Sequence, residues 1–278
     1  MHDTSRQGVA IGFFDGVHIG HREILRGART ALTFRTHPLA TLAPERAPRL
    51  IMPFAKREAA IRACGVEEVV ALDFTPSFAA LSPEEFARRF LRERIVRCGA
   101  NWRFGKAGAG DAALLSRLGY DVRVSPYALF AGERVSSTRI RAAIECGDLP
   151  SANAMLSRAW SVEGRVVRGT GLGGKIGAPT VNLELDGLEL RLPRGVYAVV
   201  AGGARGVANW GVAPTMREAA WTHETLEINF IDPPPAPSPV LETAFLRFMR
   251  PERVFDSIEE LARQIRLDRE AVSLLHDQ

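Results

Sequence analysis

The hydrophobic pattern of this chain changes its period near residue 158, and each period allows only a small set of folds. Before that point, short apolar runs alternate with segments of helical spacing, which predicts a parallel sheet with crossover helices. After it, strand-like runs follow one another with Gly and Pro between them, which predicts a small antiparallel barrel or sandwich. We therefore expect an α/β chain of two domains, residues 1–158 and 159–278, in line with roughly 100–200 residues per domain.

The expected strands of the first domain are Gly8–Phe14, Ala31–Phe34, Val66–Leu72, Ile95–Cys98 and Tyr120–Val124. Its expected helices are His21–Arg29, Phe54–Cys64, Asp111–Leu118, Ser137–Glu145 and one that begins at Ser82, where Pro83 and Glu85 complete a capping box. The expected strands of the second domain are Ser161–Val167, Thr180–Leu185, Gly195–Val200, Gly206–Trp210, Leu226–Ile231 and Leu241–Phe248. A closing helix should follow a capping box at Asp256–Glu259, with an apolar stripe of Ile258, Leu261, Ile265 and Leu274–Leu275.

Charge and cysteine content argue against several classes of protein. Lys and Arg number 36 and Asp and Glu 32, so the net charge is +4, and the basic residues are scattered among acidic ones. A nucleic-acid binder would concentrate its basic residues, so we expect no nucleic-acid role. The three cysteines form no CxxC pair, and we find neither a signal peptide nor an 18-residue apolar run. We expect a cytoplasmic protein with no membrane association and no obligate protein partner.

The string GFFDGVHIGH at Gly12–His21 lies where the first expected strand gives way to the first helix. Ligands of open α/β sheets bind at the carboxyl ends of the strands, and a helix N-terminus there offers free N–H groups to a phosphate. His18 and His21 are three residues apart, so both can face one phosphate chain and stabilise charge on a leaving pyrophosphate. The alternative is a turn histidine followed by a helix-capping histidine.

A second anion-binding set is expected at Val135–Arg141, VSSTRIR. Hydroxyls at a helix start, with Arg141 about one turn further on, suit a phosphate. A plain serine N-cap with solvent-facing arginines is the alternative.

The glycine-rich stretch Gly169–Asn182, GTGLGGKIGAPTVN, suits a loop that wraps phosphates, although it is not a Walker A motif. Thr180 and Asn182 are two apart on an expected strand, so their side chains share a face and offer oxygen atoms to Mg²⁺ and phosphate. A glycine-rich hairpin with two outward-facing polar residues is the alternative.

Together these motifs resemble the bacterial bifunctional riboflavin kinase/FMN adenylyltransferase family. The first-domain resemblance lies in FDGVHIGH, Phe34–Pro38 (FRTHP), Asn101–Gly105 (NWRFG) and Arg134–Arg141 (RVSSTRIR), all typical of a nucleotidylyltransferase domain. It implies that ATP phosphates are contacted by His18, His21, Ser137, Thr138 and Arg141, and it places Asn101 at the same site. Gly12 and Asp15 are assigned to the same nucleotide-binding set. Phe13 departs from the family pattern, which has Asn in GNFDGVH.

The second-domain resemblance lies in GxPTxN, Gly206–Thr215 (GVANWGVAPT), Leu226–Ile228 and Phe255–Ser257, as in riboflavin kinase domains. It implies a six-stranded barrel with a helix, Mg²⁺-ATP held by Thr180 and Asn182, and Glu227 as the base for the ribityl 5′-hydroxyl. Gly171 and Lys175 are assigned to the phosphate-wrapping loop. The residues alone would allow Glu227 to be an ordinary strand carboxylate.

The resemblance implies two reactions: phosphorylation of riboflavin by ATP to give FMN, and adenylylation of FMN to give FAD and pyrophosphate. One alternative is an active kinase beside a weak or inactive adenylyltransferase domain. Another is a flavin- or nucleotide-binding regulator without turnover.

Overall fold

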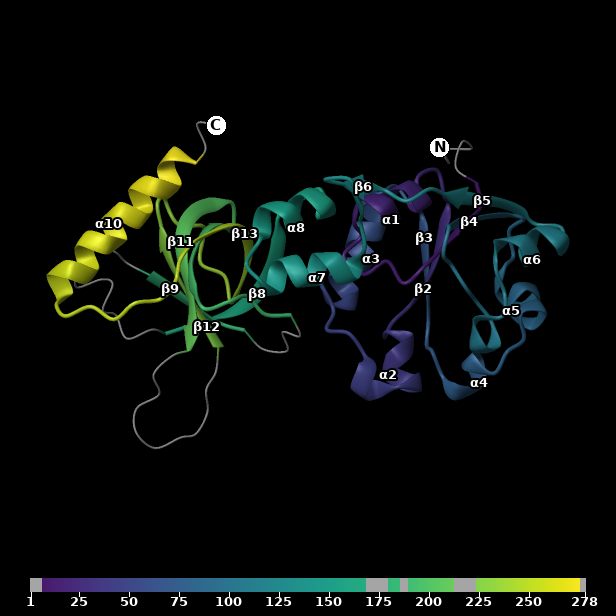
Figure 1. Ribbon diagram of the computed structural model, residues 1–278. Coiled ribbons are helices and arrows are strands. Elements are labelled where there is room, and N and C mark those ends of the chain that lie inside the picture. The colour runs from purple at the N-terminus through teal and green to yellow at the C-terminus, as the bar shows by residue number, and fades with distance from the viewer. Residues whose placement is uncertain (1–6, 169–179, 186–189, 213–223, 276–278) are drawn as a thin grey trace. The chain divides into compact units, whose positions relative to one another are not determined.

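The computed structural model describes residues 7–168, 180–185, 190–212 and 224–275 and divides the chain into two compact units, Met1–Ile140 and Arg141–Gln278 (Figure 1). The boundary of the compact units lies before residue 158, because helix α8 (Leu149–Leu156) packs on barrel strand β13 (Val240–Arg250). Each unit is described by itself. No helix in the described ranges is long and apolar enough to span a membrane.

A five-stranded parallel sheet in the order β3-β2-β1-β4-β5 forms the centre of the first unit. Its strands are β1 (Val9–Ile11), β2 (Thr30–Phe34), β3 (Glu68–Leu72), β4 (Ile95–Gly99) and β5 (Asp121–Ser125). The predicted parallel sheet is thus confirmed. Strand β1 is shorter than predicted, because the chain turns into a loop with left-handed backbone at Phe14.

Helices connect these strands and cover the sheet. They are α1 (Ile19–Leu25), α2 (Pro38–Leu42), α3 (Phe54–Ala63), α4 (Pro76–Ala79), α5 (Pro83–Phe90) and α6 (Ala112–Arg117), with 3-10 turns η1 (Pro44–Arg46) and η2 (Lys106–Gly108) and a small hairpin of β6 (Leu129–Phe130) and β7 (Glu133–Arg134). The predicted capping box of α5 is confirmed: Glu85 N–H donates to Ser82 Oγ and Ser82 N–H donates to Glu85 Oε2, both at 3.1 Å.

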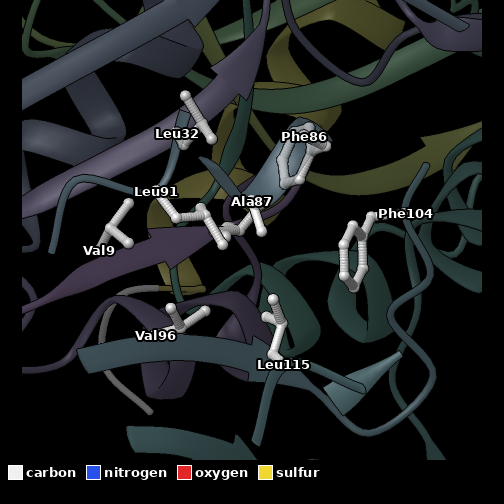
Figure 2. Close-up of a cluster of buried hydrophobic side chains, with 9 residues drawn as sticks. Val9, Leu32, Phe86, Ala87, Leu91, Val96, Phe104 and Leu115 are labelled. Carbon is white, nitrogen blue, oxygen red and sulfur yellow. The ribbon is translucent and has the colours of Figure 1, made fainter. Parts of the chain in front are cut away.

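Alternation along the strands gives the sheet two buried faces. On one face Val9, Leu32 and Val96 pack against residues of α5 and α6, as Figure 2 shows. The other face carries Ala10 and Ala31, which pack with Leu25 of α1 and Ile61 of α3. The sheet is therefore held from both sides, and its strand ends are fixed.

The second unit is a closed six-stranded antiparallel barrel in the order β10-β11-β12-β9-β8-β13. Its strands are β8 (Trp160–Val167), β9 (Thr180–Glu184), β10 (Gly195–Ala201), β11 (Ala204–Val212), β12 (Glu224–Phe230) and β13. The buried rings of Trp160, Tyr197, Trp210 and Phe245 pack together, and Phe245 has each of the others within 5.6 Å. The prediction of a barrel with a terminal helix is confirmed.

The terminal helix α10 (Ile258–Leu274) differs in detail from the prediction. Its N-cap is Ser257, whose Oγ accepts from the N–H of Glu260, so the predicted capping box at Asp256–Glu259 is wrong by one residue. Ile258 and Leu274 of the predicted stripe are more than half exposed, whereas Asp268 and Val272 are buried. The helix packs with one ion-paired carboxylate on its inner face, which an apolar pattern does not reveal.

Candidate active sites

The loop after β1, residues 12–18, carries the first group of predicted site residues. Strand β1 lies between β2, which follows it along the chain, and β4, which comes later. Such a switch in strand order opens a crevice at the carboxyl ends of the strands, where ligands bind. Asn101 follows β4 and is exposed, so it lies at the same edge of the sheet as this loop.

The loop has a strained backbone. Phe14 and Val17 have φ values of 58° and 41°, in the left-handed region that bulky L-residues rarely adopt. Both side chains are buried, so packing holds them there. A Cβ at Gly12 would stand 2.8 Å from the Phe14 ring, which explains why glycine occupies that position. Strain of this kind is concentrated at functional sites.

The two histidines are in direct contact. Their rings stack at 3.5 Å between centroids and 17° between planes. His18 Nδ1 accepts the backbone N–H of His21 at 3.3 Å, so His18 caps α1, and in the neutral ring the proton is on the other nitrogen. His21 Nδ1 is buried and has no hydrogen-bond partner among the described residues. The same placement of His18 therefore allows it both to cap the helix and to face a phosphate.

The pKa of His21 lies well below its ordinary value of 6.5. Burial of the ring is the main cause, followed by the proximity of His18 and of Arg57. The His21 ring is thus neutral at neutral pH. It can stabilise a phosphate through a single N–H donor rather than through a full positive charge.

The remaining residues of this set have different positions. The Asp15 carboxylate is buried and accepts the backbone N–H of Ile51 at 3.1 Å, so it anchors the loop. The Ser137 hydroxyl donates to the Asp15 carbonyl at 2.9 Å and so joins the loop to helix α7 (Ser137–Glu145). Thr138 is exposed, and Arg141 follows Ser137 by one turn of α7 and is half-buried.

The second group of predicted residues lies on the outer face of the barrel. Cross-strand register pairs Asn182 of β9 with Glu227 of β12, and Glu227 with Asn209 of β11. Thr180 lies on the same face as Asn182, and its hydroxyl donates to Glu227 Oε1 at 2.8 Å. The structure therefore brings Thr180, Asn182 and Glu227 together.

A cavity of about 490 Å³ opens on this face of the second unit. Thr180, Asn209 and Glu227 line its barrel side. Its other side is formed by the end of β13, the segment after it and the inner face of α10; these residues are Arg250, Glu252, Arg253, Val254, Phe255, Leu261, Ile265 and Asp268. The wall is mixed, with apolar side chains that suit a ring system and polar groups among them, as small-molecule sites commonly have.

The donor set around Glu227 suits a hard cation. Hydroxyl, amide and carboxylate oxygens are the ligands that Mg²⁺ takes in proteins, usually with substrate phosphates and water completing the shell. No cluster of three or more His, Cys, Asp or Glu side chains that could hold a metal ion occurs in the part of the chain that the structure describes. A cation here would therefore depend on the phosphates for part of its coordination. Gly171 and Lys175, also predicted for this site, lie outside the described residues.

Sequence reasoning missed two residues that the structure brings to these candidate sites. Arg57 lies fully buried beneath the β1 loop, and helical spacing puts it on the same face of α3 as Ile61, which was the available indication. Asn209 is the cross-strand neighbour of Glu227. The segment Met249–Asp256 and the terminal helix are the parts of the second domain that the sequence suggests for flavin contact, and Arg250 and Asp268 there form a bidentate ion pair in the cavity wall, with 2.7 Å between Nη2 and Oδ2.

Comparisons with known proteins match both units. A family model described as FAD synthetase matches residues 1–139, and one described as riboflavin kinase matches residues 156–275. A bifunctional riboflavin kinase/FMN adenylyltransferase of Escherichia coli strain K12 is 31% identical over 284 residues, covering 94% of this chain and 90% of the relative. The protein of the same description from Bacillus subtilis strain 168 is 29% identical over 292 residues, covering 96% and 92%.

A solved structure has the same fold along nearly the whole chain. It is a Streptococcus pneumoniae chain titled as a macrolide-efflux protein, with a TM-score of 0.85 and 28% identity over 97% of this chain and 95% of that one.

Proposed function

The chain belongs to the bacterial bifunctional riboflavin kinase/FMN adenylyltransferase family, and from this premise we propose how its residues perform the two reactions. The second unit transfers the γ-phosphoryl group of ATP to riboflavin and forms FMN. The first unit joins FMN to the adenylyl group of ATP, which gives FAD and pyrophosphate. The observation that best supports the first assignment is the Thr180–Glu227 hydrogen bond in the wall of the barrel cavity.

For the kinase reaction, we assign Glu227 as the group that accepts the proton of the ribityl 5′-hydroxyl. Phosphoryl transfer depends mostly on positioning and charge stabilisation, and one carboxylate within reach of the hydroxyl is sufficient as a base. Thr180 and Asn182 would hold Mg²⁺ and the ATP phosphates, and a bound ion would supply charge neutralisation for the transferring group. Gly171 and Lys175 are assigned to the loop that wraps the phosphates.

For the adenylyltransferase reaction, an oxygen of the FMN phosphate attacks the α-phosphorus of ATP. The bond between the α-phosphorus and the bridging oxygen breaks, and pyrophosphate leaves with the electron pair. His18 and His21 donate hydrogen bonds to the departing charge, assisted by Ser137, Thr138 and Arg141. Gly12 allows the loop to approach the nucleotide, Asp15 anchors the loop, and Asn101 contacts the nucleotide from the end of β4.

The direct test is to incubate the purified chain with riboflavin, ATP and Mg²⁺ and to separate riboflavin, FMN and FAD by chromatography. We expect FMN first and FAD after it. FMN that accumulates without FAD would contradict the adenylyltransferase assignment, and the absence of both products would contradict both assignments.

A further inference from the structure

Arg57 connects the ends of two central strands. Its side chain is fully buried, and Nη2 donates to the carbonyl oxygens of Phe34 and, at 3.0 Å, of Arg35, where β2 ends. Its guanidinium carbon lies 4.0 Å from the centroid of the Phe13 ring, directly after β1, and 5.3 Å from that of Phe54. One side chain thus holds together the ends of β1 and β2, which carry the FDGVHIGH and FRTHP motifs.

The guanidinium is only partly satisfied in this position. Nε and Nη1 are buried and have no hydrogen-bond partner among the described residues. Asp15 is near enough to favour the charged form, but burial outweighs it and lowers the Arg57 pKa to about 10. A buried cation with unused donors costs stability, so its retention calls for an explanation.

The charge of Arg57 acts on the histidine loop. The groups near His21 include the stacked ring of His18, the Phe14 ring in a T-shaped contact with 5.4 Å between centroids, and Arg57, whose charge disfavours protonation of His21. Phe13 separates the guanidinium from the loop surface, because the ring covers one face of the cation and is itself half-buried. Arg57 thus contacts the loop through the Phe13 ring, and its positive charge acts on His21 further along the same loop.

We propose that Arg57 is a positioning residue of the adenylyltransferase site. It fixes the Phe13 ring across the ends of β1 and β2, and it places a positive charge behind the loop where the polyphosphate of ATP is attracted. An aromatic ring suits position 13 in this chain because it stacks on the guanidinium. The inference rests on the proposed adenylyltransferase function, and it names Arg57 as one source of the affinity of that site for ATP.

The test compares Arg57→Met, which keeps the length of the side chain and removes its charge, with Arg57→Lys, which keeps the charge. FAD formation is measured from FMN at varied ATP concentration, urea unfolding serves as the folding control, and FMN formation from riboflavin shows whether the effect is confined to the first unit. We expect Arg57→Met to lower kcat/KM for ATP by about tenfold, mainly through KM, and Arg57→Lys to recover most of that loss. FMN formation should stay within about twofold of the wild type in both variants.

Two results would overturn the proposal: an unchanged KM for ATP in Arg57→Met, or equal losses in the Met and Lys variants, which would assign Arg57 a role in shape alone. If Arg57→Met fails to fold, Arg57→Lys and Phe13→Leu decide. Phe13→Leu removes the aromatic face and leaves the charge, so we expect KM for ATP to rise about threefold with kcat unchanged. An unchanged KM in that variant also contradicts the proposal.

A binding measurement separates this inference from the proposed function. Pyrophosphate is titrated into each variant while the His21 ring protons are followed by NMR. We expect half-saturation in Arg57→Met at a concentration about tenfold higher than in the wild type. If the wild type forms FMN but no FAD, the adenylyltransferase assignment fails, yet this titration still decides whether Arg57 contributes to anion binding.

Discussion

His21 shows how the surroundings of one residue set its chemistry. Its ring is neutral in the folded chain because burial, His18 and Arg57 all lower its pKa below 6.5. In the unfolded chain the same ring titrates near 6.5. Between those two values the unfolded state binds a proton that the folded state does not, so stability is full above about pH 6.5 and falls as the pH decreases through this window.

Replacing His21 with Gln should therefore reduce the acid sensitivity of the first unit. From pH 7.5 to 5.5, this one ring should cost the wild type on the order of 1 kcal/mol of unfolding free energy, and the variant should lack that loss. Urea unfolding at the two pH values measures the difference. An equal loss in wild type and variant would show that His21 takes up its proton normally in the folded state.

The Phe14 ring leaves no room for a side chain at position 12. In Gly12→Ala the new methyl group would meet the Phe14 ring at 2.8 Å, and Phe14 contacts His21 through its edge. We expect FAD formation to fall by about tenfold or more, since small displacements of site groups are costly, while FMN formation is unaffected. Comparable losses in both reactions would instead indicate general unfolding.

How far the sequence predicts the site depends on the kind of residue. The histidines and Glu227 could be found because polar groups in motif spacing stand out among apolar strands. Arg57 could not, because a charged residue in a helix is normally solvent-facing, and only packing shows that this one is buried. Asn209 becomes visible as a site residue only once strand register places it beside Glu227.

At the scale of elements, α10 is attached to the barrel by the Arg250–Asp268 pair. The side chains are 21% and 7% exposed, so the pair is largely buried. Asp268→Ala would leave Arg250 without its partner, and we expect it to lower the unfolding free energy by about 3 kcal/mol and to raise KM for riboflavin, because both residues line the cavity. Denaturant unfolding and FMN-formation kinetics measure the two effects.

The matched control for this prediction is Arg165→Ala, which removes a more exposed pair with Glu184 on the same barrel. We expect it to cost less than about 1 kcal/mol and to leave FMN formation unchanged. Equal costs in the two variants would contradict the distinction between buried and exposed pairs.

Elements were predictable where the pattern is long and repeated. The apolar alternation of the barrel strands located all six, and the Ser-Pro-x-Glu pattern located the start of α5. Helix α8 was missed because its eight residues offer little periodicity and it owes its position to packing on β13. The N-cap of α10 was predicted one residue too early. Asp256 and Ser257 are both good N-cap residues, and only the hydrogen bond from the Glu260 N–H to Ser257 decides between them.

At the scale of the whole molecule, each unit has its own core and its own candidate site. The two reactions should then be separable by single substitutions. Glu227→Gln should abolish FMN formation from riboflavin but still convert supplied FMN to FAD. His21→Ala should make FMN at a near-normal rate and little FAD. Chromatography of the products measures both, and loss of both activities in either variant would argue against independent sites.

The two sheets also differ in how they end. The barrel closes on itself where β13 pairs with β10, so it offers no row of unpaired backbone groups, whereas the open sheet ends at β3 and β5. Those borders carry charge, including Glu68 on β3 and the Asp121–Arg123 pair on β5. Charged edge strands discourage strand addition by a second molecule. A second molecule that adds a strand to the first sheet must therefore approach these charges, and neutralising them should promote aggregation through the first sheet before the barrel is affected.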